Sequence, residues 1–116
     1  MVTITSHTLD CVLGTHAHGI EVELVRIEPS GNRVRVFLDY TDAGGRLQEQ
    51  VELSAHHPDD QFEMVFQTGA YFARQEHLGN RIIQEVVIRF HIPDPESKIH
   101  IPLMLAPNSY SVWWSD

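Results

Sequence analysis

The strongest pattern in the sequence is an alternation of apolar and polar residues with a period of two, which recurs in short segments along most of the chain. A half-buried β-strand shows this period, because successive side chains point to opposite faces of a sheet. The segments are rich in β-branched and aromatic residues, and turn residues such as Gly31-Asn32 separate them. Their approximate ranges are 3–9, 21–26, 33–38, 50–54, 62–66, 85–92, 99–105 and 110–115. About eight strands are usual for a two-sheet β-sandwich, so we expect an all-β fold.

One segment departs from this alternation. Residues 69–78 read GAYFARQEHL, which contains good helix formers and no proline, and Gly79-Asn80 follows as a stop signal. We therefore expect one short helix, at about 69–78, between two strands.

Length and composition limit the class of protein. The 116 residues suffice for a single domain, 1–116, with its own core. Cys11 is the sole cysteine, which suits a reducing compartment. The chain has no signal-peptide pattern, and its apolar runs are shorter than the ~20 residues of a membrane helix, so we expect a cytoplasmic protein without a membrane partner. The net charge of −8 would repel phosphate backbones, so nucleic acid is not expected as a partner.

Four segments share a further pattern. They are ITSHTLD at 4–10, TD and GR within 41–46, FQTGAYF at 66–72 and HIPLMLAP at 100–107. In this order, and over nearly the whole chain, they resemble the 5-hydroxyisourate hydrolases of the transthyretin family. The resemblance implies a transthyretin-like (prealbumin-like) β-sandwich of two four-stranded sheets with one short helix. It also implies a homotetramer, built as a dimer of dimers, with small-molecule sites in a channel where the dimers meet.

The resemblance also implies three catalytic residues, which by position are His7, Arg46 and His100. Opening a cyclic amide with water needs a base, a donor for the growing oxyanion and an acid for the leaving nitrogen. Histidine suits both proton steps, and arginine offers a permanently charged fork of donors. No metal or organic cofactor is expected. The alternation around His100 directs its side chain away from the core.

The end of the chain differs from the family pattern, which closes with Tyr-Arg-Gly-Ser lining the site. Tyr110 and Ser111 fit the resemblance, but Trp114 stands in place of the arginine and Asp116 in place of the last serine. Trp113 and Trp114 are adjacent, so in a strand they face opposite sides. Trp114 either lines the pocket, where its flat apolar face would favour a larger substrate, or fills a subunit contact. We predict that five tail residues bind substrate: Tyr110, Ser111, Trp113, Trp114 and Asp116.

The remaining histidines and the thiol are interpreted as non-functional. The pairs His16/His18 and His56/His57 have spacings that can bind a metal, but no cysteine or carboxylate completes a set of four ligands, so no metal is expected. Cys11 has no basic neighbour in sequence to lower its pKa, so we expect an unreactive thiol.

Three functions remain open at this point. The first is hydrolysis of 5-hydroxyisourate, in urate breakdown, or of a related cyclic amide. The second is a diverged enzyme of specialised metabolism that acts on a bulkier heterocycle, which the altered tail suggests. The third is a non-catalytic protein that binds a small aromatic ligand, which the two tryptophans favour and the retained trio of His7, Arg46 and His100 opposes.

Overall fold

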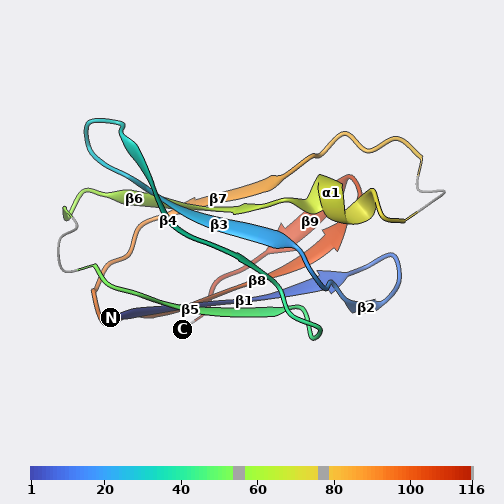
Figure 1. The fold of residues 1–116 in the computed structure, drawn as a ribbon, viewed down its shortest axis with the longest axis horizontal. Coiled ribbons are helices and arrows are strands. Elements are labelled where there is room, and N and C mark those ends of the chain that lie inside the picture. Colours follow the sequence, from blue (N-terminus) through green and yellow to red (C-terminus); the bar gives the residue numbers. More distant parts are fainter. Residues whose placement is uncertain (54–56, 76–78, 116) are drawn as a thin grey trace.

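The fold consists of two β-sheets packed face to face, with one helix at the end of the sandwich where the first strand ends (Figure 1). The structure, a computed structural model, describes residues 1–53, 57–75 and 79–115. Its elements are β1 (Val2–Asp10), β2 (Thr15–His16), β3 (Glu21–Ile27), β4 (Arg33–Tyr40), β5 (Arg46–Val51), β6 (Gln61–Phe66), α1 (Thr68–Phe72), β7 (Val86–Phe90), β8 (Lys98–Ala106) and β9 (Ser109–Val112). No helix in the described ranges has the length and apolar character needed to cross a membrane.

The first sheet has the order β2-β1-β8-β9, and β5 also pairs with β1. β5 pairs with β1 from Val2 to His7, and β2 continues the same edge opposite Leu9 and Asp10. β1 and β8 are parallel, whereas the other neighbours in this sheet are antiparallel. The second sheet has the order β4-β3-β6-β7. The predicted sandwich is confirmed, and the two-residue strand β2 is an addition that the alternation did not indicate.

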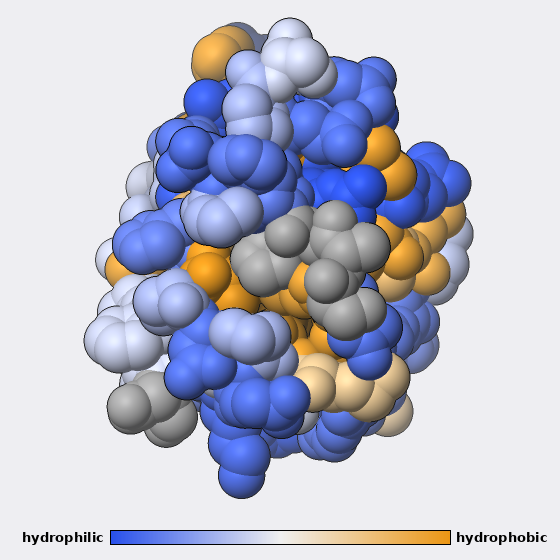
Figure 2. All heavy atoms as spheres, turned by 90° about the vertical axis from the view of Figure 1, so that its left-hand side faces the viewer, coloured by the Kyte–Doolittle hydropathy of each residue, from blue (hydrophilic) through white to orange (hydrophobic). Residues whose placement is uncertain are grey.

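The alternation in β1 divides the first sheet into an inner and an outer face. Val2, Ile4 and every second residue after them are buried, and the side chains between them are half-buried on the opposite side. The inner face packs on large side chains of the second sheet and of α1, including Phe62, Phe66 and Phe72, which are fully buried. At the end away from α1, hydrophilic side chains predominate on the surface, and hydrophobic atoms are visible in the recess between them (Figure 2). Because the core lies on the inner face of the first sheet, the half-buried side chains of its outer face are available for a site.

Three elements have boundaries that differ from those predicted. α1 ends at Phe72, because the amides of Arg74 and Gln75 donate to carbonyls only three residues back, at Tyr71 and Phe72, and the chain tightens into turns. The rest of the predicted helix, at 76–78, lies outside the described residues. β5 begins at Arg46 and ends at Val51 rather than spanning 50–54, and β9 ends at Val112 rather than at 115.

A buried carboxylate joins the end of β1 to α1. Asp10 is 1% exposed, and its Oδ1 accepts from the amides of Val12 and Leu13 at 2.8 and 3.0 Å. Its Oδ2 accepts from the Tyr71 hydroxyl at 2.7 Å and from Gln75 at 2.6 Å. Burial alone would raise the pKa of Asp10, but these hydrogen bonds outweigh it and hold the pKa below its ordinary value. Burial and the contact with Asp10 raise the pKa of Tyr71 to about 12. Asp10 thus fixes the turn that carries β2.

Replacing Asp10 should destabilise the fold in a pH-dependent way. In Asp10→Asn an NH2 group replaces one of the two acceptor oxygens and faces the donors that this oxygen bonded. The free energy of unfolding should therefore fall by about 2 kcal/mol, against about 1 kcal/mol in the control Tyr71→Phe. Because the folded pKa of Asp10 is depressed, its contribution is present above the unfolded value near ~3.9 and is lost as pH falls through the folded value. Urea unfolding between pH 7 and pH 2 should show a smaller acid-induced loss in Asp10→Asn than in the wild type. Equal losses would contradict this role.

Candidate active site

The three predicted catalytic residues lie on the outer face of the first sheet. Residues that pair across neighbouring strands have side chains on the same face of the sheet, so each set of paired residues forms a row across this face. Arg46 lies opposite His7, His7 opposite Pro102, and the amide of Trp113 donates to the Pro102 carbonyl at 3.4 Å. The adjacent row runs through Gln48, Thr5, His100 and Ser115. From strand spacing and rise, His7 and His100 have Cα atoms roughly 8 Å apart.

His7 is half-buried among positively charged or ionisable neighbours. Its Nε2 lies 3.0 Å from Nδ1 of His16, and the ring centroids are 5.0 Å apart. Burial, the charge of Arg46 and the contact with His16 lower the pKa of His7, the backbone of Gly44 opposes this, and His100 lowers it further. A histidine with a lowered pKa is neutral at pH 7 and can accept a proton. His7 therefore suits the role of a base.

His100 is held by a neighbouring strand. Its Nδ1 lies 2.8 Å from the Thr5 hydroxyl, which is 3.5 Å from the carbonyl of Ile99. The ring lies on the face opposite Ile99 and Ile101, as the alternation predicted. Because Thr5 occupies Nδ1, Nε2 remains available for proton transfer.

Arg46 is placed by a tight turn at the start of β5. Asp42 Oδ1 accepts from the amides of Gly44 and Arg46, both at 2.9 Å. Gly45 has a φ of 72° and is buried against β1, where its carbonyl accepts from the Thr8 amide at 2.8 Å. Among the ion pairs of the described residues none involves the guanidinium of Arg46, so its fork of donors is open to a ligand.

The two tryptophans are placed on opposite faces, and only one of them faces the site. Ser115 exchanges backbone hydrogen bonds with His100 at 2.8 and 2.9 Å, so the tail continues along β8. In this register Trp113 lies on the outer face beside Pro102, whereas Trp114 lies on the inner side beside Ile101. Both Trp113 and Trp114 contribute to the lining of an apolar groove between β7 and the end of the first sheet.

The other tail residues are divided in the same way. Ser111 pairs with the exposed Met104, on the outer face. Tyr110 pairs with Leu105, whose side chain belongs to the core, so it does not join the site. Asp116 lies outside the described residues.

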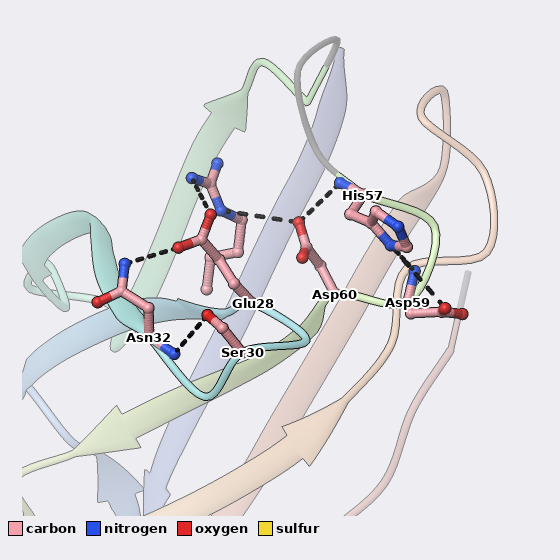
Figure 3. Close-up of polar contacts among 7 residues, drawn as sticks. Glu28, Ser30, Asn32, His57, Asp59 and Asp60 are labelled. Atoms are coloured by element: carbon pink, nitrogen blue, oxygen red, sulfur yellow. Dashed lines mark hydrogen bonds and ion pairs between the residues drawn. The ribbon is translucent and has the colours of Figure 1, made fainter.

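The remaining histidines do not form a metal site in the described ranges. No three His, Cys, Asp or Glu side chains of these residues come close enough to hold a metal ion. His57 belongs to a polar cluster at the other end of the sandwich (Figure 3), where its Nδ1 accepts from the Asp59 amide at 3.0 Å and its amide donates to Asp60 at 2.9 Å. His57 therefore shapes its own loop, and His56 lies outside the described residues.

Sequence reasoning missed two residues of this site, Thr5 and His16. Thr5 shares the outer face with His7 in the same alternating strand, which is a signal the sequence contains. The sequence suggests only a pairing of His16 with His18, because the pairing of β2 with β1 gives no sequence signal. In the structure, His16 contacts His7 instead.

The two-sheet fold and the outer face define a transthyretin-like sandwich with a basic, histidine-rich site on one sheet. The profile described as HIUase/Transthyretin family matches residues 4–114. 5-Hydroxyisourate hydrolase 2 of Rhizobium meliloti (strain 1021) is 32% identical over 112 residues, which cover 95% of this chain and 92% of that protein. The chain belongs to the HIUase/Transthyretin family, as the sequence resemblance predicted.

Solved structures agree with this assignment. The structure of Klebsiella pneumoniae 5-hydroxyisourate hydrolase has a TM-score of 0.76 and 29% identity, and the match covers 100% of both chains. Transthyretin from Sparus aurata has a TM-score of 0.82 over 97% of this chain and 95% of that chain. At 21% identity, this second likeness concerns the fold alone.

Gly45 should be required for the turn that presents Arg46. A Cβ at this position would lie 2.4 Å from the Thr8 carbonyl oxygen, in addition to the strain of its positive φ. We expect Gly45→Ala to lower the free energy of unfolding by at least about 2 kcal/mol. Gly14 has a φ of 70° and no atom within 4 Å of such a Cβ, so it is the matched control. Gly14→Ala should cost about 1 kcal/mol in the same urea titration. Equal costs would show that the close approach to β1 is unimportant.

Proposed function

We propose that the protein is a hydrolase that opens the ring of 5-hydroxyisourate, or of a closely related cyclic amide, in urate breakdown. One observation carries the proposal: Arg46 and His7 share a row, and His100 lies in the next row, on the same face of one sheet. The names of the relatives supply the substrate, since they are 5-hydroxyisourate hydrolases.

The roles follow from the surroundings of each residue. His7, neutral at pH 7, takes a proton from the attacking water. Arg46, whose guanidinium has no ion-pair partner among the described residues, donates to the oxygen that becomes negative. His100, tied to Thr5 through Nδ1, gives a proton from Nε2 to the leaving nitrogen. A flat, oxygen-rich, acidic heterocycle suits this positive surface in an otherwise acidic protein.

We further propose a homotetramer, built as a dimer of dimers, in the cytoplasm. The family resemblance implies this assembly, and the surface supports it. A groove of about 730 Å³ opens between β7 and the end of the first sheet, and its lining includes Ile88, Phe90, Val112 and Trp114. Trp114 is 64% exposed there, so a second copy of the chain would cover it.

A second candidate is an enzyme for a bulkier heterocycle. One observation favours it: Trp113 closes the row of Arg46, His7 and Pro102, where its indole offers a large flat surface for stacking. Little turnover of 5-hydroxyisourate by the wild type, and a gain in Trp113→Ala, would favour this alternative.

Removing either histidine should abolish turnover. 5-Hydroxyisourate is generated in place with urate oxidase, and its ultraviolet decay is followed with and without the protein. Because general acid–base steps contribute 10²–10⁴-fold, His7→Ala and His100→Ala should each lose at least about 100-fold in kcat. Gln50→Ala, which lies on the outer face of β5 away from the trio, should keep wild-type activity. Full activity in either histidine variant, with the assembly intact, would exclude the proposed function.

The two tryptophans should have separable effects. Trp113→Ala should lower kcat/KM for the proposed substrate about tenfold, because stacking on an aromatic face is worth roughly 1 kcal/mol or more. Trp114→Ala should leave the kinetics of assembled protein unchanged and weaken assembly, measured by sedimentation velocity. A changed KM in Trp114→Ala with the assembly intact would instead place Trp114 in the pocket.

A further inference from the structure

A second histidine is held over His7 by the backbone around β2. Leu9 pairs with His16, and Asp10 pairs with Thr15. On the far side of His16, the amide of Ala17 donates to the Thr8 carbonyl at 2.9 Å, and the Thr8 hydroxyl donates to the Ala17 carbonyl at 2.8 Å. His16 is therefore fixed from both sides, and its ring meets His7 with the ring planes 34° apart.

The contact between the two rings restricts their protonation. A neutral imidazole has one donor and one acceptor nitrogen, and a protonated imidazole has two donors. Nε2 of His7 and Nδ1 of His16 are 3.0 Å apart, so one of them must carry a hydrogen and the other a lone pair. Two protonated rings could not make this contact, since two N–H groups would then face each other. The contact with His16 involves Nε2 of His7, and the Gly44 backbone also forms a hydrogen bond with the His7 ring, so the ring is restrained by two neighbours.

We propose that His16 is a positioning residue for His7, which holds the His7 ring in one orientation and one tautomer for proton transfer. This inference rests on the proposed function of His7 as the base. A freely rotating imidazole would spend part of its time in orientations that cannot reach the attacking water. His16 does not need to contact the substrate for this role, because it acts through the His7 ring.

The charges around His7 support this role. The described groups that act on His7 are Arg46 from β5, His16 from β2, His100 from β8 and the Gly44 backbone, and no carboxylate is among them. Many histidine bases are oriented by a carboxylate, as in the Ser-His-Asp triad. Here an imidazole can orient His7 without adding a negative charge, which would raise the pKa of His7 and repel an anionic substrate.

Three variants separate positioning from general damage. In His16→Ala we expect kcat to fall about tenfold with KM unchanged, a fraction of the 10²–10⁴-fold that a general base contributes. In His16→Gln a carboxamide can hold the ring, so most of the kcat should return. His18→Ala, two residues further along the same exposed segment, should behave as the wild type. Because His16 lowers the pKa of His7, the acid limb of the pH–kcat/KM profile should move to higher pH in both His16 variants.

The outcomes are decisive in both directions. Wild-type kcat and an unmoved acid limb in His16→Ala would overturn the proposal, and so would equal losses in His16→Ala and His18→Ala. ¹⁵N NMR of the histidine rings tests the contact without any substrate. We expect a single His7 tautomer in the wild type and a mixture in His16→Ala. If the wild type does not turn over 5-hydroxyisourate, the proposed function fails, and NMR still decides whether His16 fixes His7.

Discussion

The parallel pairing of β1 with β8 is the constraint on which the rest of this structure depends. It joins residues 95 positions apart, such as Thr5 and His100, and its register sets which side chains meet on the outer face. Parallel neighbours need a long crossover connection, and here that connection includes the whole second sheet. β5 pairs with the other side of β1, and the end of the chain pairs with β8. A register shift of one residue between these strands would move side chains to the opposite face and separate His7, Arg46 and His100.

β1 shows how one strand serves both the fold and the site. Its inner face carries buried polar side chains as well as apolar ones, and each has a partner: the Ser6 hydroxyl donates to the Ile101 carbonyl at 2.7 Å, and Thr8 donates to Ala17. Because these buried hydroxyls have hydrogen-bond partners, they fix the register of the strands and avoid the cost of burying an unpaired polar group. The outer face of the same strand can then hold Thr5 and His7 in fixed positions, as a catalytic face requires.

The charge distribution separates this face from the rest of an acidic protein. Several other arginines pair with carboxylates, as where Arg33 and Arg89 both pair with Glu63 and hold the pKa of that carboxyl below its ordinary value. Arg46 instead lies beside His7, and its charge helps to lower the pKa of that histidine. The guanidinium of Arg46 can attract an anion, and the neighbouring His7 can accept a proton, which are the two needs of the proposed hydrolysis.

The sequence by itself determined the all-β class and most strands, and its family resemblance predicted His7, Arg46 and His100 as catalytic residues, because period-two patterning and short motifs are local properties of the chain. It indicated the outward direction of His100 for the same reason. It could not decide the length of α1, where the chain tightens after Phe72 as Gln75 binds Asp10. Only the tertiary structure decided that His16 meets His7, that Thr5 holds His100 and that Trp113, not Trp114, faces the site. These depend on register between strands distant in sequence, which no local pattern encodes.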